Sequence, residues 1–544
     1  MRMKCRAWFS TWSVLVALFL VAGPHAYGQG KKVFTHPNDG KITAASEEAY
    51  KYYAEGRDLH FKGDYRQSIA LMEKAVALDP EFAMAYRSMA TAYSNMGYVA
   101  EAKKFNQKAM DARTKVSEIE RYAIEANFYE QDEATLDKAI ESYNKIIALD
   151  PTSTWQMALG LLYANLEQWD KAISYYEVLR QAGKSSQLNY GNLAAAYMAK
   201  GAFDKAREVL EEWRTKYGPS DAISSSLADI HGYQGRLDLA LDEVEKARAL
   251  KPDEYGYVLY KGNIRRLQGN WAEAENLYQK ASTMKEPRAQ YDAETCLAFL
   301  YMEQGRFAKA EEMIKQAIAW ADKSKDDGSK AASQATHGFV LSCMGKNDQA
   351  LAALEESLKT ATDAKLSGYQ RFNLYWKGLL LTNMKALDKS QASAAEFKIQ
   401  TEKSKDKNEI GSYYDLMARI ELGKENYSQA IEYVDKALSM YGFSPLTYSA
   451  YTLETKALAH FRSGNLDKAK DVIEKIQALT SGRWNSGDTF VKSYYMLGQI
   501  YERKGDKTKA ADLYKKFLSL WKDADPGIPE VTDAGKRLAG LKVT

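Results

Sequence analysis

Cysteine and histidine are scarce in this 544-residue sequence, which contains 3 cysteines and 6 histidines. Cys5 lies near the N-terminus, so the rest of the chain holds Cys296 and Cys343 alone, too few for a disulfide framework. We expect both to be packing residues. The histidines are scattered, and His60, His231, His337 and His460 lie in different repeats, so we expect them to be packing or groove residues. These absences exclude a disulfide scaffold and give no support to a metal site.

Sequence motifs of catalysis are also missing. The chain has no HExxH zinc-peptidase motif and no GxSxG nucleophile elbow. Gly183-Lys184-Ser185 matches the end of a phosphate-binding loop, but Val178 stands where such a loop needs its first glycine. We therefore expect no enzymatic activity, no cofactor and no metal ion.

Neither sign of charge is in large excess. The sequence has 75 lysines and arginines against 72 aspartates and glutamates, a net charge of +3. Arg2, Lys4 and Arg6 account for this difference, so the chain that follows them is close to neutral. Evenly mixed charge argues against nucleic-acid binding, which needs a basic surface.

The N-terminus has the features of an export signal. Ser13 to Ala22 is an uncharged run of about ten residues, too short to cross a hydrocarbon core of roughly 30 Å as a helix. It follows the three cations and precedes Ala26-Tyr27-Gly28, which offers small residues for cleavage. We predict a signal peptide over 1–28, a polar linker over 29–45, and a periplasmic or secreted protein that is not integral to the membrane after cleavage. The alternative is an uncleaved anchor.

Most of the remaining sequence repeats one pattern. "GDYRQSIALMEKAVALDP", "GRLDLALDEVEKARALKP" and "GDKTKAADLYKKFLSL" are three of its copies. A small residue recurs in each copy, and twelve residues before it lies a second position that is glycine or alanine in all copies but one. The later positions are Ser68, Ala102, Ala139, Ala172, Ala206, Ala240, Ala274, Ala310, Ala350, Ser390, Ala430, Ala469 and Ala510. Because helices approach closely only where side chains are small, each pair predicts the contact inside an antiparallel helical hairpin.

The turn between the two helices has its own chemistry. Gly269-Asn270, Gly464-Asn465 and Gly505-Asp506 are examples. The glycine suits the left-handed conformation that ends a helix, and the following side chain is expected to cap the next helix. Asp-Pro at 79–80 and 150–151 ends the second helix, because proline cannot continue it.

This pattern resembles the tetratricopeptide repeat over about residues 46–541. Near Asn127 two registers are open, and the copy around Ser390 lacks the turn glycine. The resemblance implies an all-α superhelix, here of about thirteen hairpins, and Glu530 to Leu541 predicts a further capping helix. It is similar to repeat modules of bacterial regulators, although no kinase or DNA-binding domain accompanies it.

The repeat length changes along the chain. Successive small residues are 33 to 37 apart up to Ala274 and 39 to 41 apart from Ala310. We predict one sub-solenoid over 46–287 and a second, with longer helices or loops along one edge, over 288–544. The added segments include "ADKSKDDGSK" and "LTSGRWNSGD". They are either passive loops or contact elements, and Trp484 favours contact.

The resemblance implies that a protein or peptide partner binds along a concave face formed by the first helices. Two apolar clusters map to that face, although a shift of register would place several of these residues in the core. They are Met157, Leu161, Leu188 and Met198 in one cluster, and Phe299, Met302, Phe339 and Tyr375 in the other. We expect a non-catalytic interaction scaffold of the cell envelope. The alternative is an accessory factor for envelope polysaccharide or outer-membrane assembly that docks on a membrane complex.

Overall fold

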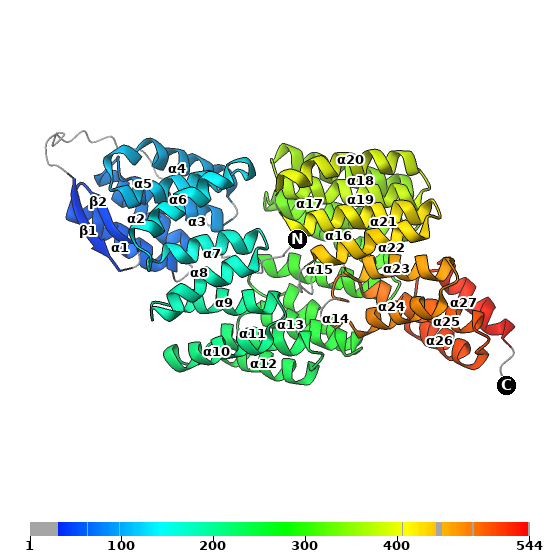
Figure 1. Cartoon of the computed structure of the whole chain (residues 1–544). Coiled ribbons are helices and arrows are strands. Elements are labelled where there is room, and N and C mark those ends of the chain that lie inside the picture. The colour runs from blue at the N-terminus through cyan, green and yellow to red at the C-terminus, as the bar shows by residue number, and fades with distance from the viewer. Residues whose placement is uncertain are drawn as a thin grey trace. The chain divides into compact units, whose positions relative to one another are not determined.

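The computed structural model describes residues 31–541 apart from 38, 62–63, 97, 405, 442–448 and 481–482. The predicted signal peptide, 1–28, lies outside the described residues. The chain forms two compact units, an N-terminal unit up to Leu193 and a C-terminal unit from Ala194, with the division inside α9 (Figure 1).

The N-terminal unit begins with two strands, after which helices alternate with short turns. Its elements are β1 Lys32–His36, β2 Gly40–Ala44, α1 Glu47–Phe61, α2 Tyr65–Leu78, α3 Ala83–Asn95, α4 Val99–Asp111, α5 Glu118–Tyr129, α6 Leu136–Leu149, α7 Trp155–Asn165 and α8 Trp169–Gln181, followed by α9 Gln187–Ala199.

Among its described residues, the C-terminal unit consists of helices joined by turns. Its helices are α10 Phe203–Tyr217, α11 Asp221–Tyr233, α12 Leu237–Leu250, α13 Tyr255–Leu267, α14 Trp271–Ser282, α15 Pro287–Glu303, α16 Phe307–Lys323, α17 Asp327–Cys343, α18 Asn347–Asp363, α19 Ser367–Asn383, α20 Leu387–Ser404, α21 Lys407–Gly423, α22 Tyr427–Met440, α23 Ser449–Arg462, α24 Leu466–Ala478, α25 Gly487–Arg503, α26 Lys507–Leu520 and α27 Pro529–Gly540. Among the described residues, α1 to α26 follow one another along the chain as thirteen successive pairs of helices, and α27 comes after them. This confirms the predicted all-α class, the number of hairpins and the extra terminal helix.

The small residues lie where the two helices of a hairpin meet. All thirteen of the later small residues, from Ser68 to Ala510, are buried. At five of the six copies in which the earlier position is glycine, a large side chain of the second helix fills the space, and at Gly378 Leu416 of α21 does so. A Cβ built on Gly262 would lie 2.5 Å from Cε1 of Tyr278, and one on Gly498 would lie 2.5 Å from Cε1 of Tyr514. Glycine and tyrosine therefore complement each other in volume across the hairpin.

The predicted turn chemistry is confirmed in part. Gly269, Gly464 and Gly505 have φ of 82°, 82° and 83°, which is the left-handed conformation. Asp64 and Asp506 accept hydrogen bonds from the first turns of α2 and α26. The expected asparagine caps are wrong, because Asn270 and Asn465 make no side-chain cap bond. An ionised carboxylate is a stronger acceptor than an amide oxygen, which favours aspartate here.

Helix length changes at the point where the repeat length changes. Helices α15 to α21 have 17 or 18 residues, whereas α1 to α14 have 11 to 15. Segments such as "ADKSKDDGSK" thus extend the end of one helix and the start of the next.

The prediction of a polar linker before the first hairpin is wrong over residues 32–36 and 40–44, which pair as antiparallel strands with Lys32 opposite Ala44. Ile42 and Ala44 are fully buried and join the core around α1. The backbone amide and hydroxyl of Thr43 donate to Glu120 on α5, at 2.8 and 2.6 Å. The sequence did not reveal this because the partners that hold the strands lie far along the chain.

Asp39, which directly precedes β2, links the β-hairpin to α1. Its carboxylate accepts two hydrogen bonds from Arg57, at 2.6 and 2.8 Å, and one from the Tyr53 hydroxyl at 2.7 Å. All three side chains are buried. Burial by itself raises the pKa of Asp39, but the Arg57 guanidinium outweighs it and holds this pKa well below the usual range.

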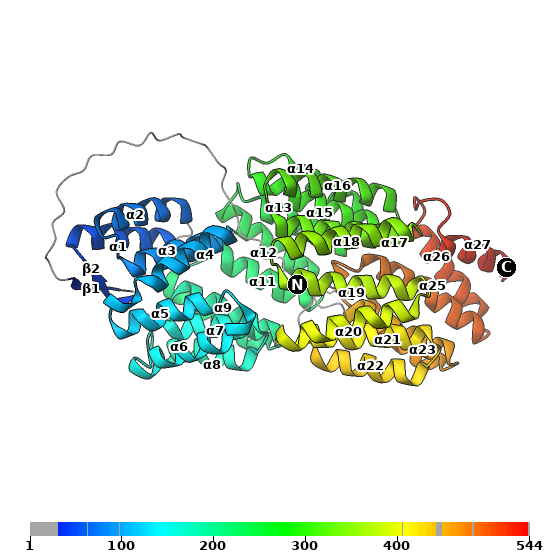
Figure 2. The ribbon, with the colours of Figure 1, turned by 90° about the horizontal axis from the view of Figure 1, so that it is seen from above.

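Contacts between its two ends close the C-terminal unit on itself. The first helices, which carry odd numbers, contact one another from α17 through α19, α21 and α23 to α25, and α25 also contacts α15. One core cluster joins residues of α13 to α17 with residues of α25 to α27. In Figures 1 and 2 the orange and red helices lie against the green ones.

A buried ion pair lies at the centre of this closure. Arg266 Nε lies 2.5 Å from Glu303 Oε2, and the two side chains are 3% and 1% exposed. Arg266 also donates to the carbonyl of Trp484, 218 residues further along, at 2.8 Å. A Cβ built on Gly487, the first residue of α25, would lie 2.6 Å from Glu303 Oε2, so any larger residue there would displace the Glu303 side chain. Formation of the ion pair and packing of the start of α25 are therefore coupled.

Two further groups of contacts complete the closure. Before α25, Thr480 donates to the carbonyl of Gly232 at 2.7 Å, and Arg483 donates to the carbonyl of Leu267. After α26, Trp521 Nε1 donates to the carbonyl of Glu303 at 2.9 Å. Asp525 accepts a hydrogen bond from the amide of Ala308, at 2.7 Å, and thereby caps α16 from 217 residues away.

We expect Asp39→Asn to release the β-hairpin, because it leaves the buried Arg57 without its counter-charge, a change that costs about 3–5 kcal/mol. Faster amide hydrogen exchange over residues 32–44 would show this, with Asp58→Asn, on the exposed face of α1, as the control. Since the folded pKa of Asp39 is lowered, its contribution to stability is present above its ordinary pKa of 3.8 and is lost as pH falls below that value. Equal exchange in the two variants would contradict the assignment.

Gly262→Ala should destabilise the C-terminal unit by about 1–3 kcal/mol, because the new methyl group overlaps the Tyr278 ring. Gly535→Ala in α27 is the matched control, since no atom lies within 4 Å of its built Cβ. It should stabilise by about 0.5–1 kcal/mol through helix propensity. Denaturant unfolding of both variants measures the difference, and two changes of the same sign would refute the volume argument.

Asp525→Ala should open the start of α16 locally. Loss of this cap should lower the free energy of opening by about 1 kcal/mol, so the Ala308 amide should exchange several-fold faster. Asp523→Ala removes an exposed carboxylate two residues away and should leave that amide unchanged. If Ala308 stays equally protected in both variants, Asp525 does not stabilise the closure.

Candidate binding cavity in the C-terminal unit

The closure encloses a cavity of about 630 Å³. Its wall is formed largely by first helices, with α17, α19, α21, α23 and α25 each contributing side chains, and by the segment that follows α26. Because the cavity lies between α17 and residues 521–530, it exists only when the two ends of the unit are joined.

One side of the cavity is aromatic. Phe339 on α17, Trp376 on α19 and Tyr451 on α23 come from three different hairpins. The ring centroid of Phe339 lies 5.1 Å from that of Trp376 and 5.9 Å from that of Tyr451, in edge-to-face geometry. Trp376 and Tyr451 are 6.2 Å apart. These edge-to-face contacts between aromatic rings hold the wall in place.

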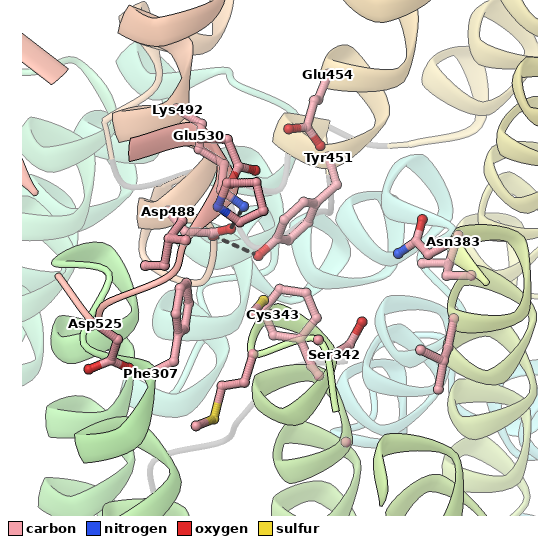
Figure 3. A pocket seen from close by; sticks show the side chains of 18 of the residues that line it. Phe307, Ser342, Cys343, Asn383, Tyr451, Glu454, Asp488, Lys492, Asp525 and Glu530 are labelled. Atoms are coloured by element: carbon pink, nitrogen blue, oxygen red, sulfur yellow. Dashed lines mark hydrogen bonds and ion pairs between the residues drawn. The ribbon is translucent and has the colours of Figure 1, made fainter. Parts of the chain in front are cut away.

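The part of the lining next to Tyr451 carries charge, from Asp488, Lys492, Glu454 and Glu530 (Figure 3). Lys492 Nζ lies 3.6 Å from Asp488 Oδ2, and the Tyr451 hydroxyl donates to Asp488 Oδ1 at 3.1 Å. Arg419 Nη2 donates to the carbonyl of Tyr451, at 2.7 Å, and lies 3.8 Å from Glu454 Oε2. Asp525 and Glu530 complete the charged lining.

Burial and neighbouring charges shift the pKa values of these groups. Burial by itself lowers the pKa of the Lys492 ammonium, but Asp488, with Glu530 and Glu454, outweighs it and raises this pKa well above its ordinary value. Burial raises the pKa of Glu454, and Arg419 reverses this only in part. Burial also raises the pKa of the Cys343 thiol to about 12, which keeps it protonated and poorly nucleophilic.

Four of the eight sequence-predicted contact residues belong to the first of the two predicted clusters, Met157, Leu161, Leu188 and Met198. Leu161 on α7 and Leu188 on α9 are 41% and 47% exposed. Met157 lies half-buried one helical turn before Leu161. Met198 is 8% exposed and is a core residue.

The other four residues divide between core and cavity. Met302 and Tyr375 are each 2% exposed, and the Tyr375 hydroxyl donates to Asp415 at 2.5 Å. Phe299 is half-buried against the core of the closure, and Phe339 lines the cavity. The placement of Met302 and Tyr375 agrees with the alternative in which they are core residues. Contact of any of the eight with a partner stays a prediction.

Sequence reasoning missed the cavity's charged side. Asp488 and Lys492 lie one helical turn apart, a spacing common on solvated helix faces, so nothing marked them. The clearest signal was Trp484 in an added segment, whose ring lies 5.9 Å from that of Tyr260 in the closure.

Two negative observations hold for the described residues. No three His, Cys, Asp or Glu side chains among residues 31–541, outside the gaps, are arranged to hold a metal ion. None of the described helices is both long and apolar enough to cross a membrane.

Sequence families identify the repeat. Three family models described as tetratricopeptide repeat match residues 47–82 and 491–520, 131–187 and 226–289, and 290–363. A TPR repeat-containing protein of Methanocaldococcus jannaschii is 23% identical over 463 residues, which cover 75% of this chain and 76% of that protein. The human antiviral innate immune response effector IFIT1 is 24% identical over 317 residues, covering 54% of this chain and 63% of that protein.

Solved structures give weak global similarity. The APC/C hetero-tetramer Cut9–Hcn1 matches at a TM-score of 0.33 and 12% identity, covering 91% of this chain and 97% of that chain. A tetratricopeptide repeat protein from Parabacteroides merdae matches at 0.32 and 18% identity, covering 44% of this chain and 94% of that one.

Since the matched repeat models fall in both units and agree with the observed hairpins, the chain is a tetratricopeptide repeat protein.

Proposed function

We propose that this protein is a non-catalytic scaffold that binds a protein or peptide partner through its first helices. The observation that carries the proposal is the cavity, whose wall is assembled from five first helices and combines an aromatic side with a charged side. A partly enclosed, mixed lining of this kind gives a partner both buried apolar contact and fixed polar contacts. Tetratricopeptide repeats generally mediate protein–protein interaction, which agrees with this role.

The proposal includes a second contact region in the N-terminal unit. Leu161 and Leu188 are large apolar side chains exposed on first helices. Exposed leucines are common and need no explanation singly, but two of them at corresponding faces of repeats suit an apolar anchor of a partner.

We also propose that the protein acts in the cell envelope or outside the cell. The support is the basic N-terminus, the short apolar run and the small residues at 26–28. Detection of the mature chain, with its N-terminus sequenced, in periplasmic or culture fractions tests this part of the proposal.

Partner recovery from envelope extracts tests the binding role. The expected result is that Phe339→Ala, Leu161→Asp or both lower recovery of a specific partner at least ten-fold, because each removes an apolar contact from its unit. Leu239→Asp is the matched control, since Leu239 is 47% exposed on the second helix α12. Circular dichroism confirms that each variant is folded. Unchanged recovery with both folded variants, or equal loss with Leu239→Asp, would refute these contact sites.

A further inference from the structure

The carboxylates of the cavity outnumber its cations. Four carboxylates line it, against one lysine and one arginine, and they are Glu454, Asp488, Asp525 and Glu530. A fifth, the fully buried Asp415, lies behind the lining, 3.9 Å from Arg419 Nε. Unless carboxylates are protonated, the site therefore carries net negative charge in a partly enclosed space, where charges interact more strongly than in bulk water.

Neither cation of the lining is available to an anion. The ammonium of Lys492 faces Asp488, whose side chain is only 3% exposed. Arg419 is held between Asp415 and Glu454 and also donates to the Tyr451 carbonyl. A phosphate or a C-terminal carboxylate would have to displace these carboxylates, so the charge pattern disfavours an anionic ligand.

The aromatic rings of the cavity add a second attraction for a cation, besides that of the carboxylates. The faces and edges of Phe339, Trp376 and Tyr451 come together from three repeats. A cation placed over a tryptophan or tyrosine face is attracted by the ring, and this attraction grows when water is excluded. A planar guanidinium can stack on such a ring while it donates to carboxylates on the other side. A methylene stem fits against the remaining apolar lining, which includes Leu379 and Leu458.

We infer that the cavity receives an arginine side chain from a basic segment of a partner protein. The guanidinium stacks in the aromatic wall and pairs with Glu454 and Glu530. The inference rests on the proposed binding function and names the chemistry of the partner. The carboxylates around Lys492, which outweigh burial and raise the pKa of its ammonium, agree with it.

A fluorescein-labelled dodecapeptide of four Gly-Ser-Arg repeats is the probe, and fluorescence anisotropy of the full-length mature protein is the measurement. Binding should saturate, and the same peptide with citrulline in place of arginine should bind at least ten-fold more weakly. The double variant Glu454→Gln with Glu530→Gln should weaken arginine-peptide binding roughly ten-fold, or about 1.4 kcal/mol. Trp376→Leu should weaken it as well, because the stacking face is lost.

The matched control removes equal charge from the outer surface. Glu432→Gln with Asp467→Asn changes two exposed acids on the second helices α22 and α24 and should alter binding less than two-fold. If both double variants weaken binding equally, the attraction is non-specific and the inference fails. Citrulline peptide that binds as tightly, or spermine that displaces the peptide completely at equal concentration, also overturns it.

Failure of this inference is distinguishable from failure of the proposed function. If the arginine peptide does not bind but Phe339→Ala still abolishes recovery of a partner, the cavity binds a partner of different chemistry. If neither result is obtained, the cavity is not a binding site. Hydrogen exchange at Ala308 gives an independent readout, since a bound arginine bridging the two ends should slow exchange at the closure.

Discussion

The closure of the C-terminal unit depends on the buried ion pair between Arg266 and Glu303. Both groups are nearly inaccessible to water, and leaving either one unpaired would be strongly unfavourable. The pair forms within neighbouring hairpins, and Arg266 makes a further hydrogen bond to the Trp484 carbonyl. The first residue of α25 lies against the Glu303 carboxylate. Local folding therefore creates a buried guanidinium that gains another hydrogen-bond acceptor from the distant end of the chain.

This arrangement alters the usual energetics of a solenoid. In a simple repeat array each hairpin contacts only its neighbours, and stability is a sum of local terms. Here Thr480, Arg483, Trp521 and Asp525 make contacts across more than two hundred residues. Such contacts have a high entropic cost of loop closure, so we expect them to form after the hairpins are in place. Once formed, they make the first and last repeats of the unit mutually dependent.

The closure also explains why the cavity has its particular chemistry. Its aromatic side belongs to the middle repeats, while Asp488, Lys492 and Glu530 arrive with α25 and α27. The aromatic rings share one cavity with Asp488, Lys492 and Glu530 only because the unit folds back on itself. Tyr451 links them, since its ring packs on Phe339 and its hydroxyl is bonded to Asp488.

The sequence by itself determined the repeat and most of the helical hairpins. Small residues at fixed spacing leave room for one close helix contact, as Gly262 beneath Tyr278 illustrates, and turn glycines end the first helices. These are interactions within about forty residues, so their signature is local and readable. It also named Phe339, which lines the cavity, while its contact with a partner stays a prediction.

Only the tertiary structure decided the β-hairpin, the closure and the charged cavity. Asp39 meets Arg57 inside the N-terminal unit, Arg266 meets Trp484 at a separation of 218 residues, and Asp488 faces rings from other repeats. The physical reason is that a charged side chain on a helix looks the same in sequence whether it faces water or a distant partner. Each repeat is rotated slightly relative to the one before it, and these rotations add up over many repeats. Their sum decides which distant repeats come into contact, and the sequence of a single repeat does not reveal it.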